Sequence, residues 1–302
     1  MPVHNGADFL TATLTSLLQE PMDGVEILLL DSSPDDSCEA IVKQFERRLP
    51  ILYHVRRDVM PWPEKTNVGV DMARAPFVAM LHQDDLWLAG RVEAARRAID
   101  AMGDAAMHVS SAVLIDEHGK RIGCWSPPLQ AGLHAGANII ERLLVQNFIA
   151  IPTPLIRRSA WLEVGGMDPD LWYTADWDLY LKLARAWPVM VSADAVTAFR
   201  LHSKSLTMTG TRNAASLREQ LEVVLARYGR HMGRRTSRHA WASIKINCAL
   251  AAAASGDGRG IIHVVMALTS LRPWEMPRFL KETRLVERLL PRARLWLAGS
   301  FS

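Results

Sequence analysis

Short apolar runs alternate with helix-like patterns in the first part of the chain, and this alternation constrains the fold more than any other feature. The apolar runs that favour buried strands lie at residues 25–30, 51–55 and 77–81. Apolar side chains recur at helical spacing in residues 8–19, 38–48, 65–73 and 91–102. Strands that alternate with helices of this length predict an α/β fold, in which crossover helices connect the strands of a sheet.

The three apolar runs all end in polar residues. The first ends at Asp31, the second is followed by residues 56–58, and the third leads into Asp84 and Asp85. In open α/β sheets, ligands bind outside the carboxyl ends of the strands. We therefore expect these polar strand ends to converge on one crevice, which is the first place to look for chemistry.

The adjacent carboxylates of Asp84 and Asp85 have two interpretations. Neighbouring carboxylates repel each other, so a fold that fixes both usually offsets the repulsion with a divalent cation or with hydrogen-bond donors from a ligand. Asp is also a preferred N-cap, and the pair could cap a helix over residues 86–91. Both interpretations are open at this point.

Length and composition exclude several classes of protein. The 302 residues suffice for one large α/β domain with an appendage or for two ordinary domains. No apolar run approaches the roughly 20 residues of a membrane-spanning helix, and residues 1–6 lack the features of a signal peptide. The three cysteines are widely spaced and predict neither a disulfide framework nor a zinc site. We expect a cytoplasmic protein.

Charge is distributed unevenly along the chain. Residues 1–209 carry 19 Lys and Arg against 26 Asp and Glu, whereas residues 210–302 carry 16 against 6. The pattern is helical from residue 214 onward, which predicts a first domain at 1–210 and a basic α-helical C-terminal region at 211–302. This region could contact anionic lipid at the inner face of the cell membrane, through an apolar side of residues 276–290. Solvated helix faces, packing against the first domain and a dimer contact are the alternatives.

Six segments between residues 1 and 206 resemble, in their order and spacing, the family-two inverting glycosyltransferases of the GT-A fold. They are Pro-Val-His-Asn-Gly at 2–6, Leu-Asp-Ser-Ser at 30–33, Asn-Val-Gly at 67–69, Gln-Asp-Asp-Leu-Trp at 83–87, Val-Gly-Gly-Met-Asp at 164–168 and Asp-Trp-Asp-Leu-Tyr-Leu-Lys-Leu at 176–183. The resemblance implies a mixed sheet flanked by helices. It also implies transfer of a sugar from a nucleotide-diphosphate-sugar donor.

The resemblance implies a metal and diphosphate site around the acidic pair. Asp85 is expected to bind the metal, and Asp84 the ribose hydroxyls of the donor. His202 matches a family histidine that completes the metal site or touches the pyrophosphate, and Arg200 nearby suits a diphosphate. Hard oxygen ligands favour Mn²⁺ or Mg²⁺, which would stabilise the charge of the departing diphosphate. A polar loop residue is the alternative for His202.

Other positions of the motifs are expected to bind the nucleotide. Asp31 matches the family position that hydrogen-bonds the base, although a turn Asp would follow the same pattern. Pro2, Val3 and Asn5 match the end of the first strand, and Asn67 matches a segment on the donor side.

Asp176 matches the catalytic base of the family. An inverting transfer needs a base that takes the proton from the acceptor hydroxyl as the oxygen attacks the anomeric carbon. A carboxylate at this helix start is also favoured by the helix dipole alone. Asp178 faces away from Asp176 on a helix and is expected to be structural. Arg157, Arg158 and Trp161 match the acceptor side, with helix surface and core packing as the alternatives.

The chain departs from the family pattern at several points. The apolar strand that usually precedes Pro-Val is nearly absent, so either the first strand is a stub or the start of the chain is misassigned. His82 stands where many relatives carry another Asp, Ser32 replaces a frequent second Asp, and Ala175 replaces a Glu. A neutral imidazole at position 82 would be a softer ligand or would only fill space.

These features favour a metal-dependent, hexosyltransferase-like enzyme that acts with inversion in polysaccharide biosynthesis. Its partners would be the donor and a saccharide or lipid-linked acceptor, and no nucleic acid is expected. A nucleotidyltransferase is an alternative, although residues 4–8 lack the Gly- and Arg-rich loop that it requires. A scaffold protein whose catalysis was eroded is another.

Overall fold

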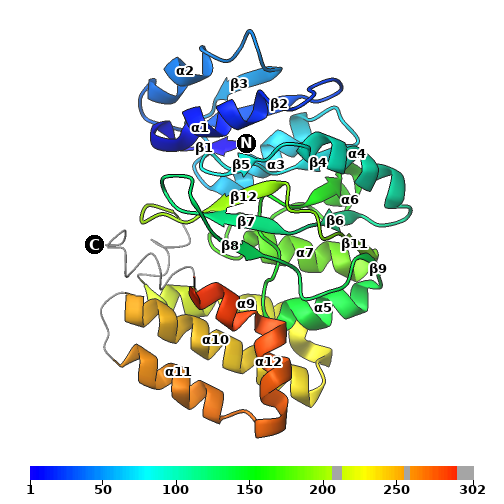
Figure 1. The fold of residues 1–302 in the computed structure, drawn as a ribbon, viewed down its shortest axis with the longest axis vertical. Coiled ribbons are helices and arrows are strands. Elements are labelled where there is room, and N and C mark those ends of the chain that lie inside the picture. Colours follow the sequence, from blue (N-terminus) through cyan, green and yellow to red (C-terminus); the bar gives the residue numbers. More distant parts are fainter. Residues whose placement is uncertain (206–212, 255–258, 291–302) are drawn as a thin grey trace.

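The computed structural model describes residues 1–205, 213–254 and 259–290. Figure 1 shows a small sheet with two helices at one end of the molecule, larger sheets in the middle and a layer of helices at the other end. The expected α/β class, with a mixed sheet flanked by helices, is confirmed.

The first part of the chain forms a three-stranded parallel sheet in the order β1-β2-β3. Its elements are β1 (Pro2–Val3), α1 (Ala7–Leu17), β2 (Ile27–Asp31), α2 (Ser37–Val42), β3 (Ile51–Val55) and α3 (Trp62–Met72). Leu10, Leu14 and Leu17 recur on one face of α1 and are buried against β2 and α2. The helix expected at 38–48 ends at Val42 and continues as turns.

The middle of the chain forms two mixed sheets. Their orders are β4-β10-β6-β11-β9 and β5-β12-β7-β8. The strands are β4 (Phe77–Ala79), β5 (Leu86–Trp87), β6 (Met107–Val109), β7 (Ala112–Ile115), β8 (Arg121–Trp125), β9 (Gly132–His134), β10 (Leu155–Arg157), β11 (Val189–Val191) and β12 (Thr197–Arg200). The helices are α4 (Arg91–Ala101), α5 (Gly136–Val145), α6 (Arg158–Glu163) and α7 (Ala175–Ala186).

The apolar residues at 109–115 favour a single strand and the Pro- and Gly-rich residues at 126–136 favour a loop, but the structure differs from both expectations. The strand is divided because the chain leaves one sheet after Val109 and enters the other at Ala112. Between them, the backbone of Ser111 bonds to Asp194 instead of a neighbouring strand. The loop contains β9, which pairs with the edge of β11.

The last part of the chain is helical, as expected. Its elements are α9 (Ala214–Tyr228), η2 (Gly229–His231), α10 (Arg234–Ala254), α11 (Gly260–Thr269), η3 (Pro273–Glu275) and α12 (Met276–Thr283). Leu217, Leu221 and Val224 of α9 belong to the same hydrophobic core as α5 and α7. The domain boundary near residue 210 lies outside the described residues and stays a prediction.

The apolar side expected at residues 276–290 does not face solvent as a whole. Phe279 is fully buried, and Leu280 packs against the same small core with residues of α10 and α11. Phe279 and Leu280 pack into this core and do not face solvent. The prediction that these two residues contact lipid is therefore wrong. In the described ranges, the helices are too short or too polar for a transmembrane segment.

Candidate active site

The short first strand is held by a side chain. β1 has only two residues and pairs with β2, so Val3 lies beside Asp31. The amide of Gln83, in the turn after β4, accepts a hydrogen bond from His4 N at 2.8 Å and donates one to His4 O at 3.1 Å. The Gln83 side chain thus makes two hydrogen bonds with the backbone of His4, as a neighbouring strand would. These bonds connect the end of β1 to the turn that carries Asp84 and Asp85.

Asp31 lies at the carboxyl end of β2 and is almost fully buried. Its Oδ1 accepts hydrogen bonds from the backbone N and the hydroxyl of Ser33 at 2.7 and 2.6 Å, which is an Asx turn. Its Oδ2 accepts one from the Tyr53 hydroxyl at 2.8 Å. Asn5 has a φ of 50° and donates its backbone N–H to Ser33. Pro2, Val3, Asn5 and Asp31 are therefore brought together.

Asp84 and Asp85 do not cap a helix, so that interpretation was wrong. Residues 86–87 form β5, and the next helix, α4, begins at Arg91 with Gly90 at its N-cap. Asp84 lies in a turn, and Asp85 follows it, with its backbone N–H directed at the carbonyl of His82. The two carboxylates are therefore placed at the end of β4, where ligands bind in such folds.

The end of β12 meets this turn. His202 Nε2 lies 2.9 Å from Oδ2 of Asp84, although 118 residues separate them. Asp85 is 1% exposed; its Oδ1 accepts a hydrogen bond from the Arg200 backbone at 3.0 Å, and its Oδ2 has no hydrogen-bond partner among the described residues. The structure thus brings the four predicted residues Asp84, Asp85, Arg200 and His202 together, but it pairs His202 with Asp84.

Arg200 is used to shape the turn. Its side chain donates hydrogen bonds to the carbonyls of Asp84, Asp116 and Glu117 at 2.7–3.1 Å. It also lies over the ring of Phe9 at 5.0 Å. These contacts fix the acidic turn against the β7–β8 hairpin, which makes Arg200 a positioning residue in this structure.

The two carboxyls differ in acidity. Burial and the charge of Asp84 raise the pKa of Asp85 well above its usual range. Burial also acts to raise the pKa of Asp84, but the hydrogen bond to His202 and the nearby His82 outweigh it and lower that pKa. Burial lowers the pKa of His82 to about 4, so its imidazole is neutral at pH 7. The site therefore has one ionised carboxylate and a second that ionises readily only beside a cation.

A tryptophan connects this turn to the helix of the predicted base. The Trp62 ring packs edge-on against His82, with 5.3 Å between ring centroids. Its Nε1 donates a hydrogen bond to the carbonyl of Trp172 at 2.8 Å, three residues before α7. His82 thus has a packing role, which is one of the two alternatives that the sequence left open.

Asp176 lies in the first turn of α7 and is partly buried. Its Oδ1 accepts a hydrogen bond from the backbone of Trp177 at 2.8 Å, and its Oδ2 accepts one from the Asn147 side chain at 3.1 Å. Burial raises the pKa of Asp176 to about 6, although both hydrogen bonds act in the opposite direction. A carboxyl with this pKa can accept a proton near neutral pH, as a general base must.

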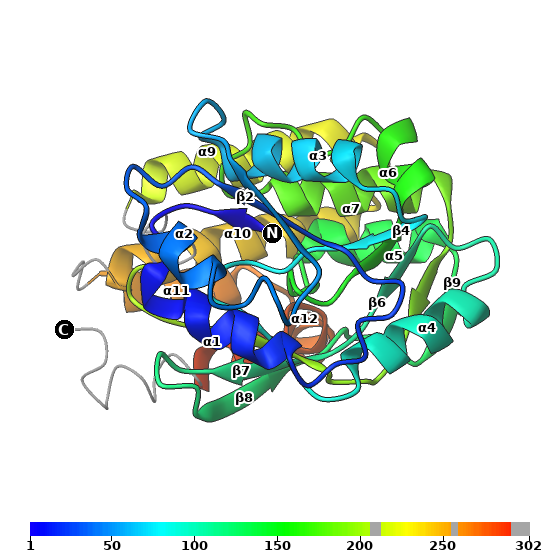
Figure 2. The same cartoon turned by 90° about the horizontal axis from the view of Figure 1, so that it is seen from above.

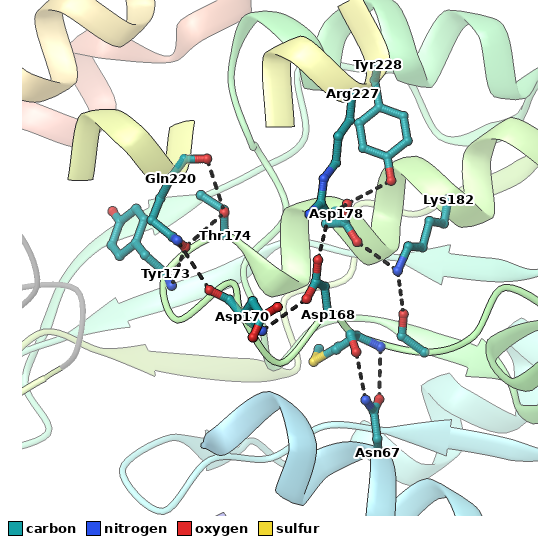
Figure 3. A network of polar contacts seen from close by, with 12 residues as sticks. Asn67, Asp168, Asp170, Tyr173, Thr174, Asp178, Lys182, Gln220, Arg227 and Tyr228 are labelled. Carbon is teal, nitrogen blue, oxygen red and sulfur yellow. Dashed lines mark hydrogen bonds and ion pairs between the residues drawn. The ribbon is translucent and has the colours of Figure 1, made fainter. Parts of the chain in front are cut away.

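The same helix is anchored by a buried polar network, which Figure 3 shows. Asp178 is fully buried. Its carboxylate forms ion pairs with Lys182 at 2.8 Å and Arg227 at 3.1 Å, and it accepts a hydrogen bond from the Tyr228 hydroxyl at 2.8 Å. Arg227 also pairs with Asp168 at 2.7 Å. The structural role expected for Asp178 is confirmed, and α9 supplies two of its partners.

Asn67 belongs to the edge of this network and not to the acidic turn. Its amide donates to the carbonyl of Met167 at 2.8 Å and accepts from the backbone of Met167 at 2.9 Å (Figure 3). It therefore holds the Gly-Gly-Met loop onto α3. Its predicted contact with the nucleotide stays a prediction.

Two neighbours of the site were missed by sequence reasoning. Lys65 is buried, and its ammonium donates to Val3 O at 2.8 Å and to the Ser32 hydroxyl. Burial lowers its pKa to about 8, although Asp31 acts against this. Asn147, which orients Asp176, lies in a loop that carries no motif. The only sequence feature that pointed to Lys65 was its position two residues before Asn67. No sequence feature pointed to Asn147.

The acceptor-side interpretation of Trp161 is wrong. Its ring is 1% exposed and belongs to the central core, because α6 turns this side toward α7. Arg158 donates to the carbonyls of Val70 and Asp71 at 2.8 Å, and Arg157 packs over Phe77. Core packing and surface contacts account for all three residues.

Comparison with known proteins shows which proteins this chain resembles. Residues 1–129 match the family model of glycosyl transferase family 2, which confirms the resemblance seen in the motifs. An uncharacterized glycosyltransferase of Rickettsia prowazekii is 22% identical over 210 residues, or 69% of this chain and 65% of that protein. An uncharacterized glycosyltransferase of Haemophilus influenzae is 23% identical over 186 residues, or 61% of this chain and 60% of that protein. The chain thus spans less than two thirds of the length of these two relatives.

Solved structures show the same GT-A fold. Residues 1–349 of S. aureus TarS in complex with UDP-GlcNAc superpose with a TM-score of 0.59 at 15% identity, over 93% of this chain and 77% of that chain. The mannosyltransferase PcManGT from Pyrobaculum calidifontis, in complex with GDP-Man and Mn²⁺, superposes with a TM-score of 0.53 at 16% identity, over 93% and 82%.

Proposed function

We propose that this protein transfers a hexose from a nucleotide-diphosphate-sugar donor to a hydroxyl of a saccharide or lipid-linked acceptor, with inversion. The observation that carries the proposal is Asp176, a partly buried carboxyl with a pKa of about 6 at the start of α7. Inversion requires one base on the side opposite the leaving diphosphate. Asp176 would take the acceptor proton, and Asn147 would hold the carboxylate in place.

The acidic turn would bind the diphosphate side of the donor with a divalent cation. No group of three His, Cys, Asp or Glu side chains is arranged for a metal within the described ranges. Asp84 and His202 nevertheless converge at 2.9 Å, and the buried Oδ2 of Asp85 has no hydrogen-bond partner there. Two protein ligands suffice when substrate phosphates and water supply the others. Mn²⁺ or Mg²⁺ would stabilise the charge of the leaving diphosphate.

These contacts refine the expected division of roles. We propose Asp84 and His202 as the metal ligands, supported by Asp85, whereas the sequence assigned the metal to Asp85 and His202 and the ribose to Asp84. Val3, Asn5 and Asp31 would line the nucleotide side. The donors in the TarS and PcManGT structures, UDP-GlcNAc and GDP-Man, support a nucleotide diphosphate sugar here.

Replacement of the base tests the proposal. Asp176→Asn should lower kcat by about 10²- to 10⁴-fold, because the amide cannot accept the proton. The assay is a screen of common nucleotide sugars, read by nucleotide release with and without manganese, with exposed Asp104→Asn as the matched control. Full turnover in Asp176→Asn would refute the assignment. A wild type that is stabilised thermally by nucleotide diphosphates but releases none would favour a binding protein.

The metal is tested separately. EDTA should abolish turnover, and Mn²⁺ or Mg²⁺ should restore it. His202→Ala should raise the metal concentration for half-maximal activity by about tenfold or more, because a loss of about 1.4 kcal/mol of binding free energy corresponds to tenfold. The control is His118→Ala, whose side chain is 80% exposed. Unchanged activity in EDTA would contradict the metal assignment without affecting that of Asp176.

A further inference from the structure

The outermost helix of the C-terminal region presents an apolar face to solvent. α11 lies at the end of the molecule opposite β3, beyond α10 (Figure 1). The exposed fractions are 58% for Ile262, 53% for Val265 and 63% for Met266. Their spacing places them on one side of the helix. Ala267 and Leu271, on the opposite side, are buried in the core shared with α10 and α12.

This composition is unusual for a surface helix. Residues 260–269 contain no Asp, Glu, Lys or Arg, whereas a surface helix normally has charged residues on its solvent side. The solvent side of α11 is apolar except for the exposed His263 and Thr269, and a helix with apolar residues on both sides is typical of one that is covered on both sides. The protein core covers one side of α11, and a cover for the other side would come from outside the described residues.

An exposed tryptophan and an arginine follow α11 in the chain. Trp274, in the 3-10 turn after α11, is 73% exposed. The guanidinium of Arg272 lies over its ring, 5.6 Å from the centroid. Exposed Trp is enriched where proteins meet the headgroup level of a membrane, and a neighbouring cation can pair with a lipid phosphate.

The charge of the C-terminal region as a whole is positive. The acidic residues that follow α11 in the described chain are each paired with an arginine: Glu275 with Arg238 at 2.5 Å, Glu282 with Arg278 at 2.6 Å and Glu287 with Arg284 at 3.5 Å. The whole region 211–302 carries 16 Lys and Arg against 6 Asp and Glu. A twofold dimer through α11 would bring two regions of the same positive net charge together, which is unfavourable. An anionic lipid surface is complementary to both the charge and the apolar side chains.

We propose that Ile262, Val265, Met266 and Trp274 dock this protein on an anionic bilayer, with α11 lying in the headgroup region. The ten residues of α11 would span about 15 Å, which is half of the hydrocarbon thickness, so the helix lies on the membrane and does not cross it. The proposal moves the lipid contact expected at residues 276–290 to the preceding helix. It is independent of the sugar-transfer chemistry.

Vesicle co-sedimentation of the full chain tests the proposal. Wild type should bind vesicles of phosphatidylcholine with 30% phosphatidylglycerol, about tenfold more tightly than pure phosphatidylcholine, as expected for a few cations near the surface. The double variant Val265→Glu, Met266→Glu should lose at least about tenfold in binding, because charge replaces apolar contact. Arg272→Gln should lose about fivefold on the anionic vesicles alone.

The matched control is Leu133→Glu on β9, since Leu133 is 57% exposed but lies far from α11 in the fold. It should bind vesicles like wild type. All changed positions are exposed, and equal melting temperatures would show that the variants fold. The proposal is overturned if the double variant binds anionic vesicles as tightly as wild type. It is also overturned if wild type binds no vesicles while light scattering shows a dimer that the double variant dissociates.

Discussion

The carboxyl groups of this protein differ in their burial and in their hydrogen-bond partners, and the sequence did not predict these partners. The motifs identified Asp84, Asp85 and Asp176 as the important acids. Which carboxylate of the pair meets His202 depends on the geometry of the turn, because adjacent side chains in a turn point in different directions. The sequence therefore located the acidic site but could not pair its members. Asn147 could not be found at all, since an Asn in a loop is compatible with many roles.

The pKa of Asp176 leads to a prediction for the pH dependence. The base must be ionised, so turnover should be half-maximal near pH 6, nearly full about one pH unit higher, and should fall with unit slope below pH 6. The hydrogen bond from Asn147 lowers the pKa of Asp176. Asn147→Ala should therefore move the acid limb of the kcat profile to higher pH. An unmoved limb in this variant would show that another group controls it.

At the scale of single elements, α7 illustrates how a functional helix is fixed. Its start next to Asp176 and the structural role of Asp178 followed from the sequence, because residues two apart on a helix point in different directions. The partners of Asp178 on α9 did not follow, since long-range contacts between elements leave no trace in one sequence. The division of the expected strand 109–115 has the same origin, because the switch between sheets depends on which strands lie nearby.

The network around Asp178 should contribute strongly to stability. Asp178→Ala leaves Arg227 and Lys182 without their buried carboxylate, and removal of one partner of a buried ion pair costs about 3–5 kcal/mol. Thermal and urea unfolding measure the loss. Glu222→Ala, which removes the exposed pair with Arg218, should cost less than about 0.5 kcal/mol. Equal effects of the two changes would contradict the network's importance.

At the scale of the whole molecule, the first helix after the predicted boundary near residue 210 shares the core of the preceding part of the chain. Leu217, Leu221, Val224 and Leu225 of α9 are buried with α5 and α7 in one cluster. A chain of residues 1–205 should therefore be insoluble or molten, because it loses roughly 6–12 kcal/mol of burial, which is comparable to total stability. Size-exclusion chromatography and calorimetry measure this. A monodisperse fragment with a cooperative melt would show that the first domain folds alone.

The shared core has a consequence for synthesis on the ribosome. When residue 205 has been added, the sides of α5 and α7 that α9 covers are still open, and α9 is complete only at Tyr228, 23 residues later, which takes about 1–5 s at ordinary elongation rates. During this interval the nascent chain carries an uncovered apolar surface next to the segment that holds Asp176. Chaperone demand and expression yield of this protein should thus depend on how quickly its C-terminal helices emerge.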